Sequence, residues 1–117
     1  MMTQRFRLGI VPGGGCAHEA HVSQHDAPVH FEVELYAEEG ELSIPASASA
    51  AVEGTTASGV KATGACARSG QTVRFDLPAA MTAEMGRHEM EVVLTDGGRE
   101  LRSRRFAVCV EGDPVLL

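Results

Sequence analysis

The sequence predicts an all-β domain, an antiparallel β-sandwich of about seven strands. Five segments alternate apolar and polar residues with a period of two, as strands with one buried face do. Turn residues separate the segments at intervals of roughly 8 to 12 residues, a spacing typical of sandwiches. With 117 residues, the chain has the length of a single domain. We therefore predict one domain over residues 1–117, with a long loop at 12–28.

The five clearest strands each carry apolar residues at alternate positions. They are residues 5–10, 29–36, 72–77, 89–94 and 105–110. Because the other positions are mostly polar, each strand has one face for the core and one for solvent, which is typical of antiparallel sheets. Residues 41–68 alternate more weakly, and we predict two short strands there. The aromatic share is only 4%, so the core must be largely aliphatic.

Turn and helix signals connect these strands. Asp96-Gly97 lies between two alternating segments and predicts a hairpin, because the turn needs residues with positive φ. Pro78–Met85 carries one or two turns of helical character and is followed by Gly86, a natural helix stop. We expect a short helical crossover between the two sheets near residues 79–85.

The last strand contains a fault in its alternation. Leu101 and Phe106 are both apolar but five residues apart, so strict alternation would place them on opposite faces. A β-bulge within Ser103–Arg105 would bring both side chains to the core. Without the bulge, Leu101 would lie outside.

The composition argues against several classes of protein. The formal net charge is −6, which disfavours binding to nucleic-acid phosphates, and no apolar run approaches the roughly 20 residues of a membrane span. Residues 1–10 alternate polar and apolar side chains, so we expect no signal peptide. Three cysteines are too few for a disulfide scaffold and fit a reducing compartment or an unpaired thiol. We expect neither a nucleic-acid partner nor a membrane.

The segment Pro12–Pro28 is rich in glycine and histidine and carries one unusual cluster. Cys16, His18, His21 and His25 fall within ten residues. Thiolate and imidazole are ligands that zinc and similar ions prefer, so these four are candidate metal ligands. Alternatively, the segment is a solvated polar loop, or one that becomes ordered against a partner subunit. Loops of this length within a compact domain are usually functional or disordered.

Signals for catalysis are weak. Cys16 and His18 are a candidate thiol–imidazole pair, but the glycine-rich segment around them offers nothing to hold the pair in place. Cys66 and Cys109 fall in or near strand patterns, where thiols are usually inert small hydrophobes. The run Gly13–Gly15 follows a strand but lacks the Lys-Ser/Thr pair of a phosphate-binding loop. We expect no enzymatic activity and no cofactor.

Two charged groups are candidates for protein–protein contacts. Basic residues crowd the final strand region, and acidic residues follow the strand at 29–36. The candidate interaction residues are Arg99, Arg102, Arg104, Arg105, Glu38, Glu39 and Glu41. Their opposite charges suit docking between copies of the chain or with another structural protein. Alternatively, they are solvated strand faces and charged edges that prevent aggregation between sheets.

Three segments together resemble a known family: Asp26–Leu35, Val73–Pro78 and Gly86–Leu94. The order and patterns of these strands are similar to the N-terminal immunoglobulin-like domain of phage baseplate upper proteins and related tail or head-fibre proteins. In that family, strands of the patterns D-x-x-V-x-F-x-L, V-x-F-x-L-P and G-x-Y/H-x-x-x-V-x-L recur. The chain departs from the family at His88, where an aromatic residue is expected near the sandwich corner.

The resemblance implies an immunoglobulin-like sandwich with a non-enzymatic structural role in a phage or prophage particle, in a baseplate, tail or head fibre. It also implies a homo-oligomer, such as a trimer, that docks with other phage structural proteins. Such a protein is made in the bacterial cytoplasm and carried in the virion. Two alternatives stay open: an immunoglobulin-like module that binds a protein or carbohydrate, and a small metal-binding protein that uses the Cys16, His18, His21 and His25 cluster. The shortage of aromatic side chains weakens the carbohydrate alternative.

Overall fold

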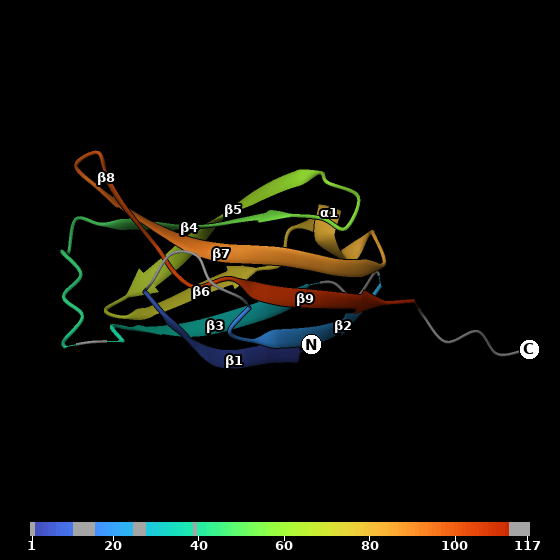
Figure 1. Ribbon diagram of the computed structural model, residues 1–117, viewed down its shortest axis with the longest axis horizontal. Helices are drawn as coiled ribbons and strands as arrows, with labels where there is room; N and C mark the ends of the chain where they lie inside the picture. Colours follow the sequence, from blue (N-terminus) through green and yellow to red (C-terminus); the bar gives the residue numbers. More distant parts are fainter. Residues whose placement is uncertain (1, 11–15, 25–27, 39, 113–117) are drawn as a thin grey trace, which may run out of the picture.

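The computed structural model describes residues 2–10, 16–24, 28–38 and 40–112 (Figure 1). The elements are β1 (Met2–Gly9), β2 (Glu19–Ser23), β3 (Val29–Tyr36), β4 (Ser49–Thr55), β5 (Lys61–Ser69), β6 (Thr72–Asp76), α1 (Ala79–Thr82), β7 (Gly86–Asp96), β8 (Arg99–Arg102) and β9 (Phe106–Glu111). The prediction of an all-β domain is confirmed. The described residues form nine strands, however, where the sequence predicted about seven.

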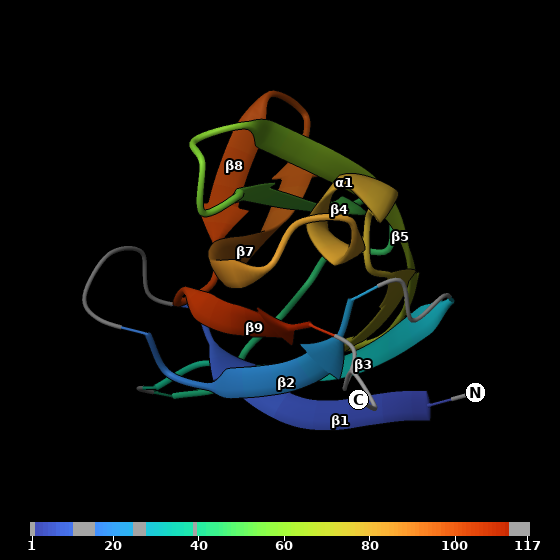
Figure 2. The same ribbon diagram turned by 90° about the vertical axis from the view of Figure 1, so that its right-hand side faces the viewer.

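The strands follow one another around a nearly closed sheet. Their order is β1-β3-β6-β5-β4-β7-β9-β2, and β8 pairs with β7 outside this path. Strand β5 turns the corner, because residues 61–66 pair with β4 and residues 67–69 pair with β6. Figure 2, which looks along the longest axis, shows the strands arranged around a central core with α1 near one end.

The prediction of a purely antiparallel sandwich is wrong at the two ends of this path. Strand β1 runs parallel to β3, and β2 runs parallel to β9. Parallel neighbours need a long crossover connection. Residues 10–28 provide one between β1 and β3, and β2 lies within that crossover. The sequence shows alternation within a strand but carries no direct signal for its direction relative to a neighbour.

The segment 12–28 is therefore more than a long loop, because β2 occupies residues 19–23 in its middle. Ala20 and Val22 of β2 are buried, and Glu19 and His21 face outward. With only two small apolar side chains in five residues, the alternation was too short to be recognised. Residues 25–27, which include His25, lie outside the described part of the chain.

The core lies between the inward faces of the strands, at the alternate positions that the sequence predicted. Phe31 is 1% exposed and Phe106 is fully buried. All four phenylalanines meet there: the Phe31 ring stacks on Phe75 with centroids 5.2 Å apart, and Phe6 lies 5.9 Å from Phe31 and 5.2 Å from Phe106. The aliphatic core thus contains one aromatic cluster, formed by side chains from β1, β3, β6 and β9.

The predicted helical crossover and the predicted β-bulge are both present. Helix α1 joins β6 to β7, within the predicted range 79–85. Arg102 pairs with Val93 and Phe106 pairs with Met90, so residues 103–105 face only residues 91 and 92, one residue fewer. The expectation that this bulge buries Leu101 is wrong, since Leu101 is 48% exposed. It lies on the β7–β8 hairpin, which projects from one end of the molecule (Figure 1).

Among the described residues, there is no helix with the length and apolar character needed to cross a membrane.

Candidate functional site

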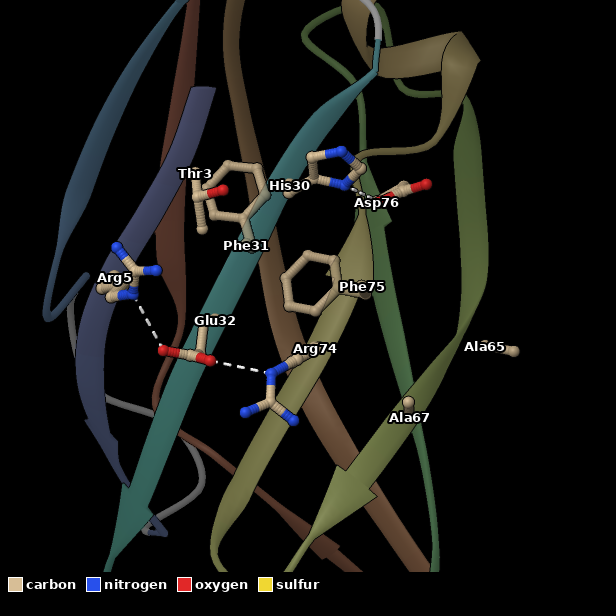
Figure 3. A pocket seen from close by; sticks show the side chains of 10 residues that line it. All are labelled: Thr3, Arg5, His30, Phe31, Glu32, Ala65, Ala67, Arg74, Phe75 and Asp76. Carbon is tan, nitrogen blue, oxygen red and sulfur yellow. Dashed lines mark hydrogen bonds and ion pairs between the residues drawn. The ribbon is translucent and has the colours of Figure 1, made fainter. Parts of the chain in front are cut away.

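The outer face of β1, β3 and β6 carries a ladder of charged side chains (Figure 3). The register places Arg5 of β1, Glu32 of β3 and Arg74 of β6 in one row across the sheet. Glu32 accepts from Arg5 Nε at 2.9 Å and from Arg74 Nε at 2.7 Å. The hydrogen bonds from Arg74 and Arg5 hold the pKa of Glu32 below its ordinary value. Glu32 therefore stays ionised and fixes both cations.

A second row lies one pleat away. Thr3, His30 and Asp76 are aligned across the same three strands, and His30 Nδ1 contacts Asp76 Oδ1. Both rows border a shallow hollow of about 540 Å³ that Ala65 and Ala67 of β5 also line. A shallow hollow lined by paired charges can offer hydrogen bonds to a protein partner, but it is too open to bury most of the surface of a small molecule, as ligand pockets usually do. Sequence reasoning missed this surface because the charges meet only once the register is known.

Arg104 and Glu38, both predicted for docking, are paired within the chain. Arg104 Nε lies 2.5 Å from Glu38 Oε1, and Nη2 lies 2.8 Å from Oε2. The hydrogen bond from Arg104 lowers the pKa of Glu38. The fold thus joins the basic and acidic stretches that the sequence keeps far apart, so this pair does not offer free charges to a second copy.

Arg102 is also engaged internally. Its Nη1 lies 2.7 Å from Glu53 Oε2, and it contacts Glu91 and Glu100 as well. By contrast, Arg99, Arg105 and Glu41 are exposed and have no ion-pair partner within the described residues. Glu39 lies outside the described residues. Three of the seven predicted interaction residues therefore remain available to a partner.

Of the four predicted metal ligands, the structure describes Cys16, His18 and His21, and it does not bring these three together. The His18 ring stacks on Phe6, with centroids 4.0 Å apart and planes 12° apart, and burial lowers the pKa of His18. His21 faces the opposite side, because residues of a strand three positions apart point to opposite faces. The Cys16 thiol donates to Glu89 Oε1 at 3.4 Å. The candidate thiol–imidazole pair is separated in the same way, because Cys16 contacts Glu89 and His18 contacts Phe6.

A different group surrounds His21 on the outer face of β2 and β9. His21 stands directly opposite Cys109, and the ligand atoms of Glu19, His21 and Cys109 all lie within 4.8 Å of one another. Arg87 of β7 donates to Glu19 Oε2 at 2.5 Å. We call Glu19, His21 and Cys109 the Cys109 cluster. Sequence reasoning missed it because Cys109 is about 90 residues from the other two.

The thiols of Cys66 and Cys109 are not activated as nucleophiles. Burial raises the pKa of Cys66 to about 11, and burial also raises the pKa of Cys109. A thiol of this kind is mostly protonated near neutral pH and reacts slowly.

Comparison with known proteins gives a clear likeness, and it concerns the fold. No protein-family model matches the chain, and no curated protein matches it. Among solved structures, the chain is similar to the N-terminal domain of phage TP901-1 ORF48, with a TM-score of 0.70. The chain shares its fold with a phage protein domain. The two align over 95% of this chain and 99% of that one, at 12% sequence identity.

At 12% identity, this likeness is evidence for the fold alone. The all-β architecture and the resemblance to a phage domain are therefore supported by the structure.

Proposed function

We propose that the chain is a non-enzymatic structural domain of a phage or prophage particle that docks through protein–protein contacts. One observation carries the proposal: nearly the whole chain aligns with nearly the whole N-terminal domain of a phage protein, with a TM-score of 0.70. A match of complete domains is stronger support than a match of a few shared strands. The immunoglobulin-like kinship and the place in a baseplate, tail or head fibre belong to the same proposal.

The site geometry agrees with a docking role. The conspicuous outer-face features are paired charges on β1, β3 and β6, and the hollow beside them is shallow. Arg99, Arg105 and Glu41 add exposed charges without an internal partner among the described residues. Charged, solvated faces of this kind direct the orientation and rate of docking more than its affinity. We propose that these three residues contribute to contacts between copies or with another particle protein.

The particle role can be tested in the source organism. Phage particles purified by density gradient after prophage induction should contain peptides from this chain in a fixed ratio to the major capsid protein. An abundant cytoplasmic enzyme, quantified in parallel, controls for carry-over. Detection of the chain only in the soluble cell extract, with intact particles free of it, would contradict the proposal.

Self-association is tested on the purified protein. Light scattering coupled to size exclusion should give a stable trimer or another closed oligomer. Replacing Arg99 and Arg105 together by Glu should shift this oligomer toward monomer, and Lys61→Glu, an exposed cation outside the predicted set, should not. If wild type is monomeric at every concentration, the homo-oligomer is wrong, while the particle role still depends on the fractionation.

The alternative of a carbohydrate-binding module loses support from the one tyrosine. Arg7 places its guanidinium carbon 4.6 Å from the centre of the Tyr36 ring, so one face of that ring is already covered. Sugar-binding sites usually stack a ring face on the sugar, and the chain contains no tryptophan. A glycan array with no specific signal is expected. A specific, saturable glycan signal would favour the binding module.

A further inference from the structure

We propose that the Cys109 cluster is a binding site for Zn²⁺ or a similar divalent ion. The parallel pairing of β2 with β9 places His21 directly opposite Cys109, and Glu19 lies two residues before His21 on the same outward face. The three side chains offer one nitrogen, one sulfur and one oxygen, all within 4.8 Å of one another. The arrangement follows from the sheet register and does not depend on the proposed structural role.

The donor set fits zinc in type. Imidazole, thiolate and carboxylate are its three common protein ligands. A thiolate and a carboxylate bring two negative charges to the ion, and the Arg87 guanidinium bound to Glu19 offsets part of the carboxylate charge. Three protein ligands leave a fourth tetrahedral position for water, which suits a site on an exposed face. Hard ions such as Mg²⁺ prefer oxygen alone and are disfavoured here.

Neighbouring side chains already orient two of the ligands. His21 Nε2 lies 3.0 Å from Glu19 Oε1, while His21 Nδ1 lies 3.5 Å from Glu111 Oε1 on the other side of the ring. A carboxylate on the second nitrogen is the usual means of fixing a metal-binding histidine. Arg87 holds Glu19 Oε2 at 2.5 Å, which leaves Oε1 directed toward His21. Glu19 and His21 are exposed, so an ion can reach the site.

The cluster differs from the ligand set expected from the sequence. Of that set, only His21 belongs to it. The Cys16 thiol faces Glu89 and the His18 ring faces Phe6. The sulfur ligand thus comes from β9, and the two possible sulfurs, Cys109 and Cys16, can be told apart by mutation.

The experiment uses full-length protein without a histidine tag, stripped with a chelator and then dialysed. Titration calorimetry with ZnCl₂ should show about one equivalent bound. Titration with CoCl₂ should give the visible bands of a tetrahedral site and a sulfur-to-cobalt charge-transfer band. Less than about a tenth of an equivalent of zinc, or cobalt spectra without the sulfur band, would overturn the proposal.

Variants identify the ligands. Cys109→Ser should abolish the sulfur-to-cobalt band, and Cys109→Ser or His21→Gln should weaken zinc binding by at least tenfold, since even an orienting partner contributes about 10- to 100-fold. Cys66→Ser and His30→Gln are matched controls on other strands and should bind as wild type does. Loss of the sulfur band in Cys16→Ser, with retention in Cys109→Ser, would assign the sulfur to Cys16 and overturn the site.

A measurement on wild-type protein tests the site without depending on whether the variants fold. With saturating zinc, alkylation followed by peptide mass spectrometry should show Cys109 protected, with Cys16 and Cys66 labelled at the same rate as without the ion. Equal labelling of Cys109 with and without zinc would contradict the site.

Discussion

Arg104 forms a two-point ion pair with Glu38, a residue 66 positions earlier in the chain. The backbone N–H of Arg104 also donates to the carbonyl of Gly9 at 2.8 Å, so the pair stands where the end of β1 meets the segment before β9. The hydrogen bond from Arg104 lowers the pKa of Glu38. Two charged residues that were predicted to dock between copies therefore pair with each other within one copy.

We expect Glu38→Gln to be slightly less stable than wild type at pH 7 and to lose less stability on acidification. A carboxyl group whose pKa is lowered in the folded state stabilises above its unfolded pKa, and this stabilisation is lost as the pH falls through the folded pKa. The difference between the two proteins should shrink between about pH 5 and pH 3. Urea unfolding at several pH values measures it. Glu41→Gln, which removes an exposed carboxylate without an ion pair in the described structure, should show no such difference.

Alternation in the sequence was sufficient to predict the strands that form the core. At Val29–Tyr36, four apolar and four polar residues alternate without a fault, and the structure buries Val29, Phe31, Val33 and Leu35. The same signal could not predict β2, where Ala20 and Val22 are the only buried residues in five. Nor could it predict the parallel pairings, because direction depends on where a connection crosses the sheet and not on the composition of the strand.

The candidate sites were harder to predict because they depend on register. His18, His21 and Cys16 are close in sequence, but His18, just before β2, stacks on Phe6, whereas His21 of β2 lies on the surface. His21 then meets Cys109, which is distant in sequence and adjacent in space. A one-residue slip between β2 and β9 would separate them, so proximity in the sequence is a poor guide to a site built across strands.

Gly54 lies at a close approach between β4, β7 and α1. A Cβ atom there would stand 2.7 Å from the Glu89 carbonyl oxygen and 2.8 Å from Met81 Cε. We expect Gly54→Ala to lower the free energy of unfolding by about 1–3 kcal/mol, because the backbone oxygen cannot move aside cheaply. Chemical denaturation measures the change. Gly64→Ala is the matched control on β5, where the nearest atom would be 3.3 Å away, and it should cost clearly less; equal losses would contradict the clash.

We expect His18 to make the free energy of unfolding depend on pH in the range below about pH 6.5. Burial against Phe6 lowers its pKa, so the folded state binds a proton less readily than the unfolded state. Stability from this group is fully present above the unfolded pKa of about 6.5 and falls as the pH drops below it. His18→Phe keeps the stacking but cannot titrate. Thermal melts from pH 7.5 to pH 5 should therefore fall less steeply for the variant, and parallel curves would count against this origin.

Phe31 holds the aromatic cluster together. It contacts Phe6, Phe75 and Phe106 and is 1% exposed. We expect Phe31→Ala to destabilise by about 3–5 kcal/mol, because the surrounding strands cannot close the cavity. Phe31→Leu should cost less, since it fills most of the space. Equilibrium unfolding in urea distinguishes the two, and a loss below about 1 kcal/mol for Phe31→Ala would contradict a central role.

His88 makes three hydrogen bonds in the interior. The Ala57 N–H donates to Nδ1 at 2.9 Å, so Nε2 carries the proton and donates to the carbonyl oxygens of Met81 and Glu84, each at 2.9 Å. The imidazole thus joins the β4–β5 turn to α1 and the start of β7. His88→Phe keeps an aromatic ring but leaves the N–H and both carbonyls without this partner. We expect a loss of roughly 2–4 kcal/mol in the free energy of unfolding. The same change at half-exposed His30 should cost much less, and similar losses at the two positions would show that the buried hydrogen bonds at His88 contribute little.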